Sequence, residues 1–254
     1  MQFYSEGFFG YGEEGNYIPY SWDFFIPIAI LIALSALLII YRKQIRNFKK
    51  EQTVRFIIGF IIIIVEMSYY WRVLYVGDEA GKTDLLSKLP IQLCEWGAIC
   101  AAFMIMSLND TLFGINYFVT FMGAGIALFV PQTVITYTGP TYYRYYQFWL
   151  EHILPILATI YVAAVHKKKP RYRDIWIAYG MIVLLAIPAT IANFAIPEAN
   201  YLYVRQDIPF IPNIYPIKVA AYSVIVLILF HILYGGWKLG EKLTGKAYMT
   251  QKES

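Results

Sequence analysis

The stretch DFFIPIAILIALSALLIIYRKQIRNFKK, residues 23–50, decides the fold of this chain. Its first part, 23–41, carries Asp23 as its only charge, and the residues that follow carry a cluster of Lys and Arg. A helix that crosses the hydrocarbon core needs about 20 mostly apolar residues, and Lys and Arg collect in cytoplasmic loops. The stretch therefore predicts a membrane-spanning helix that enters with its N-terminus outside.

The rest of the chain repeats this pattern of long apolar blocks. The 254 residues are 59% hydrophobic and 15% charged, which is less charge than a soluble domain carries. Backbone groups in lipid must be satisfied within their own segment, and the short alternating strands of a membrane barrel are absent. We predict an all-α polytopic bundle of seven transmembrane helices, over 23–41, 54–75, 88–107, 112–132, 145–166, 174–197 and 216–238.

The distribution of basic residues orients this bundle. With the N-terminus outside, the cytoplasmic segments hold 15 of the 21 Lys and Arg: six at 42–55, five at 167–173 and four from Lys238 onward. The net charge of +4 follows from this topology and calls for no nucleic-acid partner; the oligomeric state is left open. We predict a multi-pass cell-membrane protein with three parts: an extracellular arm (1–22), a membrane domain (23–238) and a cytoplasmic tail (239–254).

Both cysteines, Cys94 and Cys100, fall in the third predicted span. Six positions along a helix separate them by about 9 Å, which is beyond the reach of a disulfide. The sequence therefore shows neither a disulfide framework nor a metal motif, and we predict no metal and no other cofactor.

Polar side chains inside the predicted spans gather in the outer half of the membrane. Cys94 lies roughly 9 Å into the third span and His152 roughly 12 Å into the fifth, at 1.5 Å per residue. The same half holds four further polar residues: Glu66, Gln132, Glu151 and Asn193. Ionisable and polar groups in hydrocarbon are costly and usually functional. Their shared depth predicts one site built from several helices.

A thiol beside an imidazole points to nucleophilic chemistry. Histidine takes the thiol proton and leaves a thiolate, which is the competent nucleophile. A carboxylate then holds the imidazole in the right tautomer. Glu151 is adjacent to His152 and points about 100° away on a helix. Glu66 or Glu95, on other helices, is therefore the better candidate for the orienting group.

Each of these residues also has a structural interpretation. A single Cys in a helix is commonly a small apolar filler, and a membrane His often bonds a neighbouring helix. Arg144, Gln147 and Glu151 fall at i, i+3 and i+7 of the fifth span, which is the spacing of a buried salt-bridge ladder. His231 lies at the wrong depth to join the outer cluster, and we interpret it as structural.

The motif LPIQLC (89–94) resembles one in the YwaF-like bacterial integral membrane proteins. That family is related to vertebrate transmembrane protein 164 and, more distantly, to the androgen-induced membrane hydrolases. Its pattern Leu-Pro-Leu-His-Leu-Cys opens the third span, a later span carries a His that matches His152, and a third motif matches NYLY (200–203). The resemblance covers roughly 54–238. It implies an acyl-transfer site with Cys94 as nucleophile and His152 as base, although Gln92 stands where the family usually has His.

Three functions follow from these observations. The first, and our main prediction, is an enzyme that transfers or hydrolyses acyl esters of membrane lipids, such as phospholipids, near the outer leaflet. In that enzyme Gln92 or Asn193 donates to the oxyanion, and the substrate contacts Arg144, Asn200 and Tyr201. The second is a small-solute or proton-coupled transporter that uses intramembrane carboxylates. The third is a non-catalytic membrane scaffold.

Overall fold

The computed structural model describes residues 7–10, 18, 20–77, 88–129, 139–196, 199–205 and 211–252, with only the backbone of 245–252. Gln132 and most of the arm 1–22 lie outside these residues. Every regular element in the described part of the chain is helical. In chain order these are α1 (Trp22–Ile40), α2 (Arg42–Arg46), α3 (Glu51–Val76), α4 (Leu93–Ser107), α5 (Asp110–Phe129), α6 (Tyr143–His166), α7 (Tyr172–Ala195), the 3₁₀ turn η3 (Tyr201–Tyr203) and α8 (Tyr215–Lys252).

Six of these helices are long and apolar enough to cross a membrane: α1, α3, α5, α6, α7 and α8. The prediction of an all-α polytopic membrane bundle is confirmed. The observed helix ends agree with the predicted ones to within three residues, with two exceptions. One is α8, which continues to Lys252 through most of the segment that we predicted as a separate tail. The other is the third span.

The third predicted span begins later than we expected. We predicted a helix from residue 88, whereas α4 begins at Leu93 and has 15 residues. Pro90 has no backbone N–H, and the Gln92 N–H donates to Glu95 Oε2 at 3.0 Å, which caps the first turn. At 1.5 Å per residue α4 is roughly 22 Å long, shorter than the hydrocarbon core. This late start places Cys94 in the first turn of the helix.

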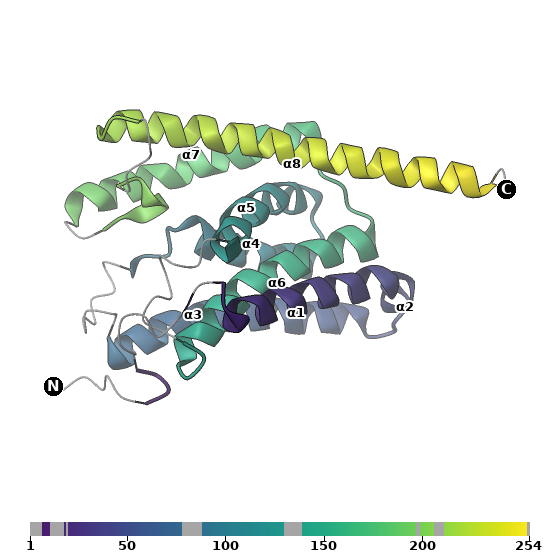
Figure 1. Ribbon diagram of the computed structural model, residues 1–254, viewed down its shortest axis with the longest axis horizontal. Helices are drawn as coiled ribbons and strands as arrows, with labels where there is room; N and C mark the ends of the chain where they lie inside the picture. Colours follow the sequence, from purple (N-terminus) through teal and green to yellow (C-terminus); the bar gives the residue numbers. More distant parts are fainter. Residues whose placement is uncertain are drawn as a thin grey trace.

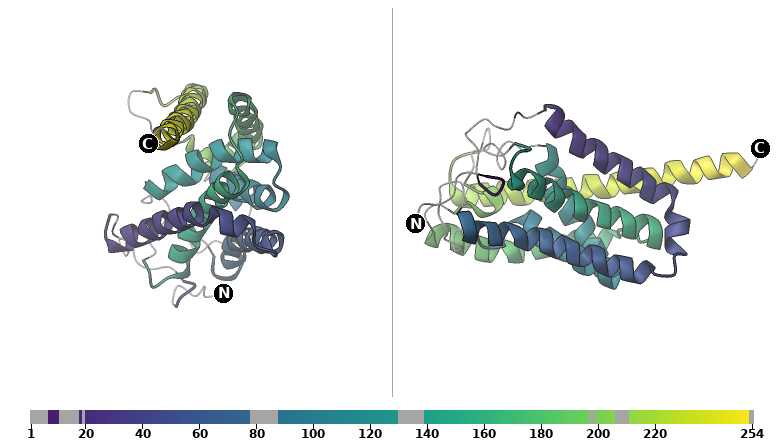
Figure 2. Two further views of the ribbon diagram at one scale, coloured as in Figure 1. Left: turned by 90° about the vertical axis from the view of Figure 1, so that its right-hand side faces the viewer. Right: turned by 90° about the horizontal axis from the view of Figure 1, so that it is seen from below.

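The helices form three layers (Figure 1). The middle layer is α4 and α5, which lies between α7 and α8 on one side and α1, α3 and α6 on the other. Figure 2 shows that α3, α6 and α8 run roughly along the same direction and that α1 is inclined to them. Small buried residues such as Ala98, Ala101 and Ala102 let α4 pack closely against its neighbours. The outermost helices, α1 and α8, expose large apolar side chains to the surroundings, as lipid-facing helices do.

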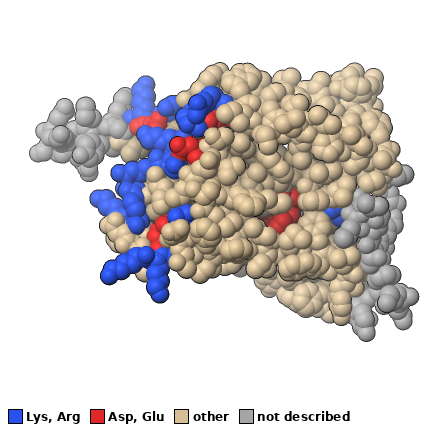
Figure 3. Space-filling view, turned by 180° about the vertical axis from the view of Figure 1, so that it is seen from behind, with Lys and Arg blue, Asp and Glu red and all other residues tan. Residues whose placement is uncertain are grey.

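Basic side chains gather at one end of the bundle (Figure 3). At this end Lys168 pairs with Asp110, joining the end of α6 to the start of α5. Arg55 donates to the carbonyls of Ile105 and Met106 at 2.9 and 2.8 Å, which joins the start of α3 to the end of α4. These contacts bring the loops of several helices to one end, which is the end that we predict to be cytoplasmic.

Candidate functional site

The structure brings Cys94 and His152 together, from the first turn of α4 and the middle of α6. Cys94 Sγ, a ring nitrogen of His152 and a carboxylate oxygen of Glu151 all lie within 4.8 Å of one another. His152 and Glu151 are buried, and Cys94 is partly buried. The thiol and the imidazole, expected at similar depth from helix position alone, are therefore neighbours. We call these three residues the Cys–His–Glu cluster.

The His152 ring is oriented by the backbone of its own helix. Its Nδ1 lies 2.7 Å from the carbonyl oxygen of Phe148, and the Phe148 ring packs against it with 4.4 Å between ring centroids. A carbonyl only accepts, so Nδ1 carries the proton and the lone pair of the neutral ring lies on Nε2. The prediction that Glu66 or Glu95 holds the ring is therefore wrong for Nδ1, because the helix supplies the acceptor itself.

The carboxylate of the cluster is Glu151, which we expected to point away. Its Oε2 accepts from Arg144 Nη1 at 3.1 Å and from Gln147 Nε2 at 2.9 Å. The predicted ladder along one face of α6 is thus confirmed. Adjacent Cβ atoms on a helix diverge, but Glu and His are long side chains, and Cys94 lies against both of them. A 100° separation at the backbone therefore does not separate the functional groups.

Glu66 and Glu95 lie near the cluster in different roles. Glu95 is buried and caps α4 through the Gln92 N–H, so its carboxylate supports the helix start. Glu66 is 2% exposed, and its Oε2 has no hydrogen-bond partner. Gln147 connects this part of α3 to Glu151, since its Nε2 also approaches the carbonyl of Val65 at 3.3 Å. Figure 3 shows acidic atoms in a hollow of the apolar surface, away from the basic end.

The LPIQLC and NYLY motifs bind each other. The side-chain oxygen of Gln92 accepts from the Leu202 N–H at 2.8 Å, and its amide nitrogen makes a longer contact of 3.4 Å to the carbonyl of Asn200. The Leu89 N–H donates to the Tyr201 hydroxyl at 2.7 Å. Gln92 therefore holds η3 against the start of α4. Its amide is engaged with the backbone and is a poor candidate for the oxyanion donor that we predicted.

Asn193 on α7 holds the other side of η3. Its Oδ1 accepts from the Tyr201 N–H at 2.7 Å, and its Nδ2 donates to the Tyr201 carbonyl at 3.1 Å and to the Tyr215 hydroxyl at 3.2 Å. Asn200 in turn accepts from the Arg205 N–H at 2.8 Å. These bonds engage the Asn193 amide and the Asn200 side-chain oxygen, two of the groups that we predicted for the oxyanion and for substrate. We assign Asn193, Asn200 and Tyr201 to the support of the site.

Tyr203 is a residue that the sequence analysis did not single out. Leu202 and Tyr203 both have positive φ, 57° and 54°, which turns the chain sharply after Tyr201. Tyr203 is 37% exposed as a whole, but desolvation around its hydroxyl raises the pKa of Tyr203, and the electrostatic influence of Cys94 and Glu151 acts in the same direction. The hydroxyl therefore keeps its proton. The second tyrosine of NYLY was the signal available in the sequence.

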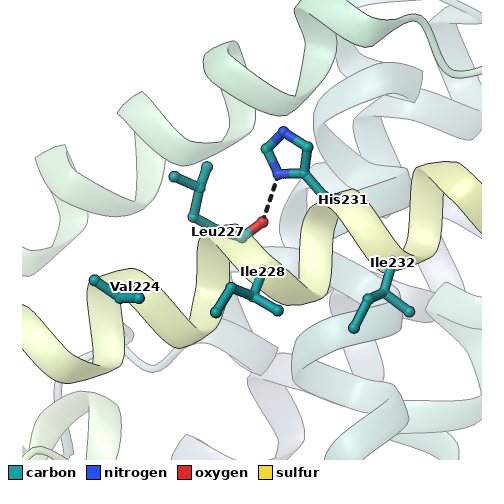
Figure 4. A pocket seen from close by; sticks show the side chains of 5 residues that line it. All are labelled: Val224, Leu227, Ile228, His231 and Ile232. Atoms are coloured by element: carbon teal, nitrogen blue, oxygen red, sulfur yellow. Dashed lines mark hydrogen bonds between the residues drawn. The ribbon is translucent and has the colours of Figure 1, made fainter.

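His231 lies apart from this cluster, on α8. Its Nδ1 bonds the Leu227 carbonyl at 2.8 Å (Figure 4), and its Nε2 lies 3.4 Å from the Tyr172 hydroxyl of α7. It lines an open apolar pocket of about 450 Å³ with aliphatic side chains of α8. These contacts agree with the structural interpretation of His231.

The fold and the cluster together define a multi-pass membrane protein with a thiol, an imidazole and a carboxylate inside its helix bundle. Residues 17–234 match the model of the TMEM164 family, and the chain belongs to this family. The relationship indicated by LPIQLC and NYLY is thereby confirmed. No curated protein and no solved structure matches the chain.

Proposed function

We propose that this protein is a membrane-embedded acyl-transfer enzyme of the cell membrane that acts on lipid esters near the outer leaflet. The observation that carries the proposal is the approach of Cys94 Sγ, His152 and Glu151 to within 4.8 Å. The bond from Nδ1 of His152 to Phe148 supports it, because it leaves the Nε2 lone pair for the thiol proton. An apolar membrane site then presents the nucleophile directly to lipid.

The reaction proceeds in two halves. His152 takes the thiol proton, and the Cys94 thiolate attacks the carbonyl carbon of a lipid ester. The tetrahedral intermediate collapses, the C–O bond to the leaving lysolipid alkoxide breaks, and the imidazolium returns its proton to that oxygen. Cys94 now carries a thioester. In the second half His152 takes a proton from the acceptor hydroxyl, which attacks the thioester, and the Cys94 thiolate leaves and regains the proton.

Three neighbours support these steps. Glu151, fixed by Arg144 and Gln147, stabilises the imidazolium that forms beside it. Tyr203 replaces Gln92 and Asn193 as our candidate for the oxyanion donor, because η3 is bonded to the start of α4 next to Cys94 and the Tyr203 hydroxyl keeps its proton. The acceptor is either a lysolipid hydroxyl or water, and the choice between them decides between transfer and hydrolysis.

One observation supports a proton-coupled transporter as the second candidate for the function of this protein. Three buried carboxylates, those of Glu66, Glu95 and Glu151, lie close enough to influence one another's charge. A proton-coupled transporter needs such groups and needs no nucleophilic thiol. The two candidates therefore differ in what happens when Cys94 alone is changed.

The test is lipid turnover in vesicles of defined composition. The purified protein is reconstituted with a phospholipid labelled in one acyl chain, together with lysophospholipid, and labelled phospholipid and free fatty acid are both measured. Cys94→Ala should abolish both products, and His152→Ala should lower the rate by about 10²–10⁴-fold. Cys100→Ser is the matched control on the same helix and should retain turnover.

Turnover that survives Cys94→Ala contradicts the covalent mechanism. An equal loss in Cys100→Ser contradicts it also, since that result would assign the effect to packing of α4. Absence of any turnover in the unaltered protein would instead favour the carboxylate-based transporter.

A further inference from the structure

We propose that the Cys–His–Glu cluster binds one divalent transition-metal ion of the zinc class, and that the bound ion holds the enzyme inactive. The donor set is a sulfur, an imidazole nitrogen and a carboxylate oxygen, all within 4.8 Å of one another. Zinc takes such ligands at about 2.0–2.3 Å, so tetrahedral ligand atoms lie roughly 3.5 Å apart. Side-chain rotations that bring the three atoms about 1 Å closer complete the geometry.

The surroundings of the cluster are those of ligands already oriented for a metal. A metal-binding histidine usually donates its second ring N–H to a backbone carbonyl or a carboxylate, and the bond from His152 to Phe148 is of this kind. A metal-binding carboxylate is itself held by hydrogen bonds, as Glu151 is by Arg144 and Gln147. Both of those bonds go to Oε2, so the carboxylate keeps further lone pairs for a metal ion.

A second observation points to a cation at the same place. Glu66 Oε2 and Gln147 Oε1 are buried acceptors without a donor, and their side chains are 2% and 1% exposed. Buried acceptors are nearly always paired, so two orphans beside one carboxylate call for an explanation. Arg144 supplies one positive charge to Glu151, and a metal ion at the cluster would add a second near these carboxylates. Such an ion also offsets the cost of holding several carboxylates in an apolar environment.

The chemistry of the donors selects the ion. A thiolate and an imidazole favour zinc and its neighbours in the transition series over magnesium or calcium, which take oxygen ligands. Binding converts Cys–SH and M²⁺ into Cys–S–M⁺ and releases one proton to solvent. The ion then occupies both the sulfur lone pair and the Nε2 lone pair that acyl transfer requires. This inhibitory consequence rests on the proposed function, whereas metal binding itself does not.

The test uses Co²⁺ as a spectroscopic probe of the purified full-length protein in nanodiscs. We expect one Co²⁺ per chain and a near-ultraviolet absorption band from thiolate coordination, which Zn²⁺ removes by displacement. Cys94→Ser should abolish the band, Glu151→Gln should weaken binding at least tenfold, and Cys100→Ser should change neither. Far-ultraviolet circular dichroism verifies that each variant is folded.

A second measurement needs no variant. Zn²⁺ should protect Cys94 of the unaltered protein from alkylation, with Cys100 as the internal reference in the same peptide digest, and a chelator should reverse the protection. Absence of protection, a Co²⁺ band that persists in Cys94→Ser, or a band lost in Cys100→Ser each overturns the metal site.

The two proposals fail in distinguishable ways. If the protein binds Co²⁺ but shows no lipid turnover under any condition, the metal site stands and the proposed enzyme is rejected. If the protein binds no Co²⁺ and its lipid turnover does not respond to Zn²⁺ or to chelator, the proposed enzyme stands and the metal site is rejected.

Discussion

The variant Asn193→Ala tests whether Asn193 stabilises the fold or takes part in the reaction. Asn193 is 1% exposed and makes hydrogen bonds of 2.7 and 3.1 Å to the N–H and carbonyl of Tyr201, which is itself buried. Asn193→Ala leaves both of these backbone groups without their partner. Each buried group left unsatisfied costs about 1–3 kcal/mol. We therefore expect the free energy of unfolding to fall by roughly 2–6 kcal/mol.

The measurement is unfolding by SDS titration in mixed micelles, followed by circular dichroism. Tyr215→Phe is the matched control, because it keeps both bonds between Asn193 and Tyr201 and removes only the hydroxyl that bonds Asn193 Nδ2 at 3.2 Å and Thr190 Oγ1 at 3.3 Å; each lost bond should cost about 0.5–1.5 kcal/mol. Lipid turnover per folded molecule should fall much less in either variant than in His152→Ala. If Asn193→Ala unfolds like the unaltered protein, Asn193 does not support the fold. If this variant also loses lipid turnover, Asn193 takes part in the chemistry instead.

Two further predictions concern packing and topology. Gly114→Ala places a Cβ 2.4 Å from Cγ of Asp174, which is buried and held by hydrogen bonds. In the same assay its free energy of unfolding should fall by about 1–3 kcal/mol. Gly125→Ala, with open space at its Cβ, should not lose stability. Cysteine in place of exposed Ile18 should react with an impermeant thiol reagent in intact cells, and cysteine in place of exposed Leu243 should not; the opposite labelling would reverse the proposed orientation.

The helix bundle was predictable because it depends mainly on the length of the apolar runs, which can be read directly from the sequence. A run such as 23–41 is apolar on every face, so its length alone predicts a span, and α1 begins and ends within one residue of the expectation. The start of α4 was not predictable in this way. Residues 88–92 include the apolar Leu89 and Ile91 directly before the block, and Pro90 and the capping by Glu95 separate them from the helix.

The candidate site was predictable in its two main residues but not in its hydrogen bonding. Cys94 and His152 are neighbours, as their positions on the two predicted spans indicated, although α4 begins five residues later than the predicted span. The partner of the imidazole could not be read from the sequence, since Phe148 contributes a backbone carbonyl that any residue provides. The role of Gln92 also depended on where η3 folds back, and this is set by positive backbone angles at Leu202 and the next residue.

The most direct test of the central claim is detection of an acyl group on Cys94. The protein is incubated in vesicles of acyl-labelled phospholipid with a chelator present, quenched in acid and digested, and the peptides that contain Cys94 and Cys100 are analysed by mass spectrometry. We expect the acyl mass on Cys94 alone, its removal by neutral hydroxylamine as for a thioester, and its loss in His152→Ala. An unmodified Cys94 under conditions of measurable lipid turnover, or equal labelling of both cysteines, would contradict a Cys94 nucleophile.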